Sequence, residues 1–227
     1  MKLIYQNEEL AELLVKFVLN KYKFIYISGN GGSGKTTFSK ILVDKLESMQ
    51  IGVNCIDMDE FVLDTKMRKS AQKQWLDEFG NNRVSEYTTS FKESYYLSAA
   101  EVIIHSIKNG LNCFYKPKKS KTFVQVFANY PITIIEGVGS AFLEKNNDAI
   151  GLFFMCDEEI EVARRIQRAR DGESQLEYVD VKRKAVERNE QFRINILPNK
   201  SKFDIELSSL ENYDLQITKD AQKIFIK

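Results

Sequence analysis

The sequence is poor in the residues that build several common kinds of functional site. It has one histidine, His105, so neither a histidine-based catalytic triad nor a histidine-rich metal site is expected. The three cysteines, Cys55, Cys113 and Cys156, are far apart and form no CxxC pair, which argues against a zinc site. Each lies in or beside an apolar run, and this favours small core residues.

Excess charge and long apolar runs are also absent. The formal net charge is +1, which gives no global reason to expect a nucleic-acid partner. No segment approaches the roughly 20 apolar residues of a membrane span, so we expect a cytoplasmic protein with no membrane partner. A length of 227 residues, 43% of them hydrophobic and 29% charged, suits one globular domain over 1–227. The sequence leaves open whether the chain is a monomer or a homo-oligomer.

Short β-rich apolar runs alternate with helical patterns along the chain. This alternation predicts a mostly parallel sheet with helices on both faces. We expect short helices and loops between residues 60 and 95, where aromatics lie among polar groups, and two short strands around a lysine-rich turn between 111 and 127. Strands are expected at 24–28, 53–57, 132–136, 151–156 and 203–207, an edge strand at 215–217, and helices at 7–21 (capped by Asn7), 97–108 and 160–170.

A complete phosphate-binding motif, G-x-x-x-x-G-K-[ST], follows the first of these strands and precedes a helical pattern. Glycines allow the tight turn in which consecutive backbone N–H groups point at phosphate oxygens, and the helix N-terminus adds positive potential. Lys35 is expected to bridge the β- and γ-phosphates of ATP, and Thr36 to bind Mg²⁺. The expected nucleotide-binding residues are Gly29, Asn30, Gly31, Gly32, Ser33, Gly34, Lys35, Thr36 and Thr37.

Carboxylates follow two of the predicted strands. Asp57 and Asp59 come at the end of the strand 53–57, and Glu136 ends the strand 132–136. Ligands of open α/β sheets bind beyond the carboxyl ends of the strands. Either acid region could therefore hold Mg²⁺ or accept a proton from an attacking hydroxyl, and solvated strand ends are the simpler alternative.

Basic side chains gather in two places. Arg164, Arg165, Arg168 and Arg170 lie on the predicted helix 160–170, where Arg164 and Arg168 share a face. This face could clamp phosphates and offset the charge of a transferred group, or be a solvated basic surface. The lysine-rich turn could attract an anionic substrate, although a solvated hairpin tip is the simpler interpretation. Its lysines are Lys116, Lys118, Lys119 and Lys121.

Five segments in order, covering most of the chain from Phe24 to Leu207, resemble the uridine kinase family of P-loop kinases, which includes phosphoribulokinase and pantothenate kinase relatives. They are ISGNGGSGKTT with the phosphate motif, CIDMDEF at 55–61, IIEGV at 134–138, and the ARRIQR and LPNK…FDI segments at 163–168 and 197–205. The resemblance implies that Asp59 is the base, that Glu136 serves the Mg²⁺ site together with Thr36 and Asp57, and that Arg164, Arg165 and Arg168 belong to a lid.

The resemblance also implies the fold and activity. We expect an α/β P-loop NTPase three-layer sandwich with a mostly parallel five-stranded sheet, an acceptor-side insert at about 62–130 and a lid at about 160–190. The implied activity is transfer of the γ-phosphoryl group of ATP, with Mg²⁺, to a hydroxyl of a small-molecule acceptor such as a nucleoside. Three positions depart from the nucleoside kinases of the family: Val62 replaces an aromatic, residues 114–117 have no histidine nearby, and Ala169 replaces an aspartate.

Two other functions remain open at this stage. One is an NTPase switch that regulates a partner, although no switch or sensor elements follow the phosphate motif. The other is a nucleotide-binding protein that has lost catalysis at the acceptor side.

Overall fold

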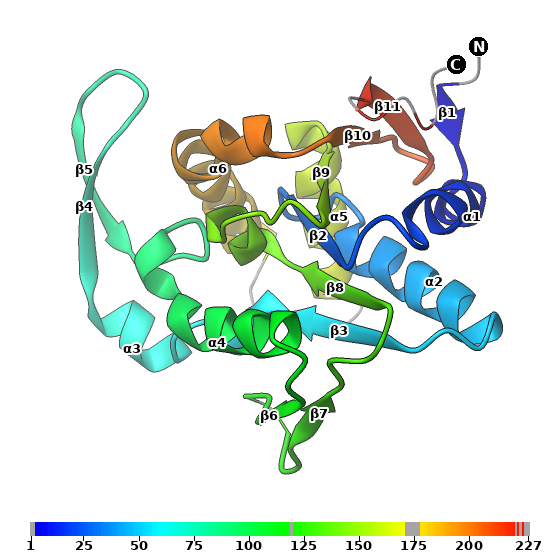
Figure 1. The fold of residues 1–227 in the computed structure, drawn as a ribbon. Coiled ribbons are helices and arrows are strands. Elements are labelled where there is room, and N and C mark those ends of the chain that lie inside the picture. The colour runs from blue at the N-terminus through cyan, green and yellow to red at the C-terminus, as the bar shows by residue number, and fades with distance from the viewer. Residues whose placement is uncertain (1–2, 119, 171–177, 221, 223, 225–227) are drawn as a thin grey trace.

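In the computed structural model, residues 3–118, 120–170, 178–220, 222 and 224 are described, with backbone alone for 169, 170 and 178–183. Among these residues, seven strands form a central sheet in the order β1-β11-β10-β9-β2-β8-β3 (Figure 1). Five consecutive strands, β10, β9, β2, β8 and the edge strand β3, are all parallel. These strands are β1 (Ile4–Tyr5), β2 (Phe24–Gly29), β3 (Val53–Asp57), β8 (Ile132–Glu136), β9 (Ala149–Met155), β10 (Ile205–Ser209) and β11 (Leu215–Asp220).

The predicted α/β sandwich is confirmed, and its parallel core has the expected five strands. The sheet is wider than predicted because β11 and the two-residue β1 continue it in antiparallel pairs beyond β10. The edge strand predicted at 215–217 is thus β11. β1 is too short to give a sequence pattern.

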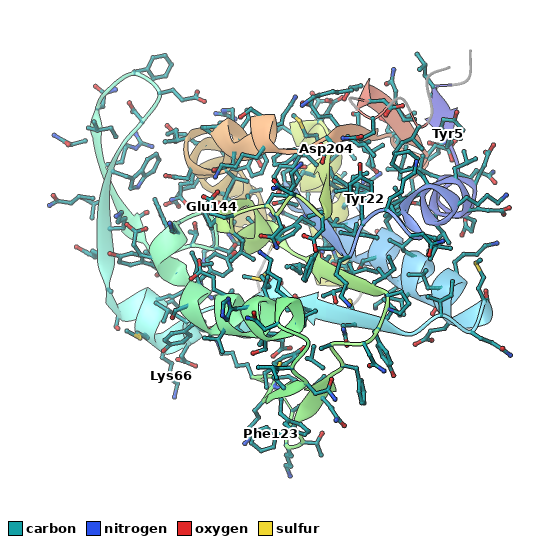
Figure 2. The ribbon with its side chains drawn as sticks, in the orientation of Figure 1. Tyr5, Tyr22, Lys66, Phe123, Glu144 and Asp204 are labelled. Carbon is teal, nitrogen blue, oxygen red and sulfur yellow. The ribbon has the colours of Figure 1, made fainter. Side chains whose placement is uncertain are left out.

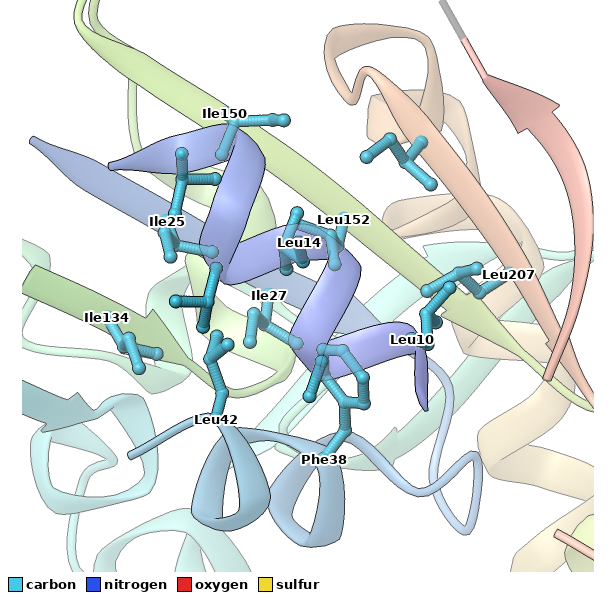
Figure 3. Close-up of a cluster of buried hydrophobic side chains, with 14 of the residues drawn as sticks. Leu10, Leu14, Ile25, Ile27, Phe38, Leu42, Ile134, Ile150, Leu152 and Leu207 are labelled. Atoms are coloured by element: carbon cyan, nitrogen blue, oxygen red, sulfur yellow. The ribbon is translucent and has the colours of Figure 1, made fainter. Parts of the chain in front are cut away.

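Helices cover both faces of the sheet, as strands buried on both sides require. Ile25 and Ile27 of β2 point to the face packed by α1 and α2 (Figure 3). Phe24 and Tyr26 belong to the apolar cluster on the opposite face. The period of two along β2 therefore feeds two separate apolar clusters. The helices are α1 (Asn7–Val18), α2 (Lys35–Ser48), α3 (Thr65–Ser70), α4 (Leu97–Lys108), α5 (Glu158–Arg170) and α6 (Tyr178–Asn195), with 3-10 turns η1 (Met58–Phe61), η2 (Lys92–Ser94), η3 (Val138–Phe142) and η4 (Leu197–Lys202).

Three local predictions were wrong. Asn7 is the first residue of α1 rather than its cap, and its side chain donates to the backbone oxygen of Tyr213 at 3.0 Å. Cys55 is exposed and Cys113 partly exposed, so only Cys156 is a core residue. Residues 60–95 contain, besides short helices, an antiparallel hairpin that extends away from the body (Figure 1), made of β4 (Gln72–Leu76) and β5 (Asn82–Glu86).

A second hairpin, β6 (Cys113–Tyr115) and β7 (Val124–Val126), confirms the two strands expected around the lysine-rich turn. Phe123 lies at its outer part, and Lys66 marks α3 on the neighbouring part of the insert (Figure 2). Among the described residues, no helix is long and apolar enough to cross a membrane.

Candidate active site

The phosphate motif forms the turn between β2 and α2, at the carboxyl edge of the parallel strands. Gly29 has φ +138°, and a Cβ there would lie 1.7 Å from the backbone oxygen of Phe154 on the neighbouring β9. Gly34 has φ +90° and immediately precedes the first residue of α2. Glycine is required at both positions because a side chain would clash with a paired strand or force a disfavoured backbone.

Lys35 lies at the base of this turn and is buried. Its Nζ donates to the backbone oxygen of Asn30 at 2.6 Å and to Oγ of Ser33 at 3.4 Å. Burial lowers the pKa of Lys35, and the carboxylates of Glu136 and Asp59 oppose this effect. The ammonium is therefore fixed within the loop, in the field of two acids from the neighbouring strands.

Two oxygen-bearing side chains meet beside Lys35. Oγ1 of Thr36, in the first turn of α2, donates to Oε1 of Glu136, the last residue of β8, at 2.9 Å. Glu136 is buried, and burial raises its pKa to about 7, with Lys35 acting in the opposite sense and the charge of Asp57 adding to the rise. Asp57 and Glu136 are direct neighbours across the β3–β8 pair.

This donor set fits a magnesium ion. Mg²⁺ prefers hard oxygen ligands and usually takes one or two from the protein, with water and substrate phosphates completing its octahedron. The described residues contain no cluster of three His, Cys, Asp or Glu side chains that could hold a metal by themselves. The hydroxyl of Thr36 and the carboxylate of Glu136 are therefore the natural pair to hold Mg²⁺ against the phosphates of a nucleotide.

Asp57 and Asp59 differ in what their side chains do. Oδ1 of Asp57 accepts from the backbone N–H of Asp59 at 2.8 Å and so caps η1. Asp59 is exposed one residue into that turn and lines the cavity above Lys35. The strand end thus presents Asp59 to the cavity, while Asp57 supports the turn that carries it.

A buried network connects the phosphate loop to α5. Nδ2 of Asn30 donates to the backbone oxygen of Cys156 at 3.0 Å and to Oε2 of Glu161 at 2.9 Å. Oε1 of Glu161 accepts from Nε of Arg165 at 2.8 Å. Glu161 is buried and was not singled out from the sequence, where it is one of several acids on a basic helix. Its spacing of four residues from Arg165 was the available signal.

Arg164 holds the loop from the other side. Its Nη1 donates to the backbone oxygen of Gly32 at 2.7 Å and to Oγ of Ser209 at 3.0 Å, and its Nη2 donates to the backbone oxygen of Leu210. Its guanidinium also stacks on the ring of Tyr213, 4.1 Å from the centroid. Arg164 is thus bound mainly to protein carbonyls, whereas Arg168 is exposed beside Gly32. A catalytic role for Arg164 stays a prediction.

One cavity of about 620 Å³ joins most of the predicted residues. Four predicted residues do not line the cavity and instead shape the loop and the strand end behind it: Gly29, Asn30, Ser33 and Asp57. The lining also contains residues that the sequence interpretation missed. Lys40 was detectable, since it lies one helical turn after Thr36, but Thr89 and Tyr213 come from loops with no motif. The predicted residues that line the cavity are Gly31, Gly32, Gly34, Lys35, Thr36, Thr37, Asp59, Glu136, Arg164, Arg165 and Arg168.

Two other side chains of the insert that the sequence drew attention to, Lys118 and Trp75, make structural contacts. Nζ of Lys118 donates to the backbone oxygens of Val62 and Leu63 at 3.1 and 3.0 Å, so this lysine fastens the second hairpin to the body. Trp75 packs against Phe91 with ring centroids 6.3 Å apart. Lys119, residues 171–177 of the predicted lid and the side chain of Arg170 lie outside the described residues.

The site combines a strand–phosphate loop–helix unit, a buried lysine, a threonine in the first turn of that helix paired with a glutamate at the end of the adjoining strand, and arginines from a later helix. Together these features define a P-loop kinase. The family model described as "Phosphoribulokinase / Uridine kinase family" matches residues 24–216. The chain belongs to this family, and the resemblance read from the motifs is confirmed.

Individual relatives are distant. The chain is 26% identical over 196 residues to a phosphoribulokinase of Synechocystis sp. (strain ATCC 27184 / PCC 6803 / Kazusa), covering 85% of this chain and 55% of the relative. It thus spans about half the length of that relative. In fold it is similar to the YGR205w protein (TM-score 0.62, 13% identity, covering 93% and 96% of the two chains). It is also similar to D-glycerate 3-kinase from Cryptococcus neoformans var. grubii (TM-score 0.60, 12% identity, covering 92% and 97%).

Proposed function

We propose that the protein transfers the γ-phosphoryl group of ATP to a hydroxyl of a small molecule. The observation that supports this most directly is the shared cavity, in which the exposed carboxylate of Asp59 faces the same space as Lys35 and Thr36. Transfer to a hydroxyl needs a group that orients the acceptor and takes its proton. A carboxylate at the turn after β3, beside the phosphate loop, supplies such a group.

The chain's own groups divide the work by position. The loop N–H groups and Lys35 hold the phosphates, and Thr36 with Glu136 holds Mg²⁺. When bound, Mg·ATP supplies the phosphoryl group and a metal charge that offsets the negative charge of the transferred group. Arg165 and Arg168 line the cavity from α5, where they add positive charge near that group. Asp59 orients the acceptor hydroxyl and takes its proton.

Two substitutions test these roles. Lys35→Ala should abolish transfer, because it removes the ammonium from the phosphate loop. Asp59→Asn should keep binding of a non-hydrolysable ATP analogue within about twofold and lower transfer by about 10²-fold or more, the usual contribution of a general base. Transfer is measured as ADP release with a panel of nucleosides, sugars and vitamins, and binding by calorimetry. Glu101→Gln, an exposed acid on α4, is the control and should behave as wild type.

Three outcomes would contradict the proposal, the first only in its choice of base. Wild-type turnover by Asp59→Asn would show that Asp59 is not the base, and Asp57→Asn would then be the next variant. Rapid ATP turnover that no acceptor changes would favour an NTPase switch. Tight nucleotide binding with no phosphorylated product from any acceptor class would favour a binding protein without catalysis.

A further inference from the structure

A second cavity, of about 300 Å³, lies between the insert and α6, on the acceptor side of the phosphate site. It is built from three segments that are far apart in the sequence: α3, the end of β5 with the residues after it, and α6. Four of its side chains are cationic, and two, Glu86 and Glu187, are anionic. The four cations are Arg68, Lys69, Lys184 and Arg188, and hydroxyl groups come from Thr65, Ser85, Tyr87 and Thr88.

The guanidinium of Arg68 is held in place by the backbone. Its Nε donates to the oxygen of Leu63 at 3.1 Å and its Nη1 to the oxygen of Tyr87 at 3.1 Å. These two bonds orient the side chain at the wall of the cavity before any ligand arrives. A guanidinium fixed in this way loses little conformational entropy on binding an anion, and its planar fork matches phosphate and carboxylate oxygens.

Arg188 lines the same cavity, and both burial and nearby charges shift the pKa of its guanidinium. Burial lowers its pKa, and the guanidinium groups of Arg165 and Arg68 lower it further, whereas Glu161 and Glu187 act in the opposite sense. The carboxylate of Glu187 is shared, because its Oε1 also accepts from Nε2 of Gln191 at 3.2 Å. Cations gathered in a partly buried cavity repel one another, and an anion bound there would relieve that repulsion.

The cavity adjoins the phosphate site. Thr88 lines it, and the next residue, Thr89, lines the cavity above Lys35. Charges from both cavities act on the hydroxyl of Tyr95. Burial raises its pKa, the Asp59 carboxylate raises the pKa further, and the Arg68 guanidinium lowers it. A small molecule with one end at Arg68 and Arg188 can therefore extend toward the carboxylate of Asp59.

We propose that the acceptor is itself an anion, with a phosphate monoester or carboxylate group bound by Arg68 and Arg188 while its hydroxyl lies at Asp59. This inference rests on the proposed kinase function, because it assigns the non-reacting end of that reaction's acceptor. A neutral nucleoside has no group that would use these cations. The Lys69 and Lys184 side chains at the same wall add positive potential that draws the anion in.

The first test needs no knowledge of the acceptor. With the phosphate loop filled by a non-hydrolysable ATP analogue and Mg²⁺, inorganic phosphate is titrated calorimetrically, and acetate is titrated in a parallel arm. Wild type should bind at least one of the two anions, and the tighter one indicates a phosphate monoester or a carboxylate. Arg188→Gln should weaken that binding about tenfold or more, the usual loss for a charged hydrogen-bond donor. Lys184→Gln, a second variant on the less buried part of α6, should weaken it to a smaller degree.

The control is Arg193→Gln, which removes a cation from the same helix outside the cavity and should leave anion binding unchanged. No binding of either anion to wild type, or equal binding to Arg188→Gln, would overturn the proposal. Failure of the wild-type protein to bind the ATP analogue would instead contradict the kinase function, so the two failures are distinguishable.

The second test compares matched acceptors that differ in charge: ribose with ribose 5-phosphate, and glycerol with glycerol 3-phosphate and glycerate. Transfer should favour the anionic members, and Arg188→Gln should raise their KM tenfold or more while leaving the KM for ATP within twofold. Phosphorylation of a neutral nucleoside with equal KM in wild type and Arg188→Gln would contradict the inference and leave the kinase function intact.

Discussion

Replacing Arg164 by glutamine should destabilise the folded protein rather than act only on phosphoryl transfer. Arg164 is 7% exposed, and its guanidinium donates to the carbonyls of Gly32 and Leu210 and to the hydroxyl of Ser209. Hydrogen bonds from a charged donor contribute about 1.5–3 kcal/mol each, and burying the cation with its Nε unpaired among the described residues offsets part of this. We expect a net loss of about 3 kcal/mol in the free energy of unfolding, within the range for breaking a buried charged contact.

The assay is urea denaturation without nucleotide, followed by tryptophan fluorescence and circular dichroism. For an m-value of about 2 kcal/mol/M, a loss of about 3 kcal/mol lowers the denaturation midpoint by about 1.5 M. Arg168→Gln is the matched control from the same helix face. Because Arg168 is exposed, this variant should have the denaturation midpoint of the wild-type protein and should lose transfer activity. If Arg164→Gln kept the wild-type denaturation midpoint and lost only transfer activity, the hydrogen bonds of Arg164 would not stabilise the fold. Arg164 would then act on the substrate.

Two further substitutions test the loop and the strand end. Gly29→Ala should lower the free energy of unfolding, measured by urea denaturation, by at least 3 kcal/mol, because its Cβ would lie 1.7 Å from the backbone oxygen of Phe154. The control, Gly80→Ala, has φ +80° but open space around the new Cβ, so it should lower the free energy of unfolding by only about 1 kcal/mol. Equal losses in the two variants would contradict the clash. Glu136→Gln should stabilise the metal-free protein by about 3 kcal/mol above pH 8 and have little effect near pH 4.5, measured in EDTA. The folded-state pKa of Glu136 is raised from 4.5 to about 7, so its stabilisation is complete below pH 4.5 and is lost as pH rises through 7. The same variant should weaken magnesium-dependent nucleotide binding, and a flat difference across pH would refute the reasoning.

The central sheet and the phosphate site could be predicted because their signals are local. A parallel strand buried on both faces is a continuous apolar run, and β8, Ile132–Glu136, has the predicted bounds. The acids at its end and at the end of β3 follow directly, because parallel strands finish at one edge of the sheet. The 97–108 helix was equally clear, since its apolar period ends at Asn109-Gly110.

The β4–β5 hairpin could not be predicted from strand pattern. Its strands are polar on both faces, with Trp75 as the one buried residue, so no period of two marks them. The available signal was the turn: Oδ1 of Asp77 accepts from the backbone N–H groups of Phe79 and Asn81 at 3.0 and 2.8 Å. An aspartate that bonds the backbone two residues on is a local turn device, and Gly80 follows with positive φ.

The roles of the two arginines on one helix face were beyond the sequence for a different reason. Arg164 and Arg168 are four residues apart and chemically identical, and the pattern assigns them to the same surface. They differ because the turn after β10 brings the oxygen of Leu210 and the ring of Tyr213 to Arg164 alone. That turn is about 45 residues away, and no helix periodicity can anticipate a carbonyl supplied from such a distance.

The proposed acceptor site is the least predictable part of the molecule for the same reason. Neither helix that lines the second cavity carries a recognisable motif: α3 carries Arg68 and Lys69 on a short polar helix, and α6 carries Lys184 and Arg188 on a helix of mixed charge. The four cations line one cavity only because α3 and α6 face one another across the end of β5. Phosphate binding can be predicted from a contiguous motif because a single loop surrounds the phosphate groups. Acceptor recognition depends on side chains gathered from separate surface segments, so a family with one phosphate loop can serve chemically different acceptors.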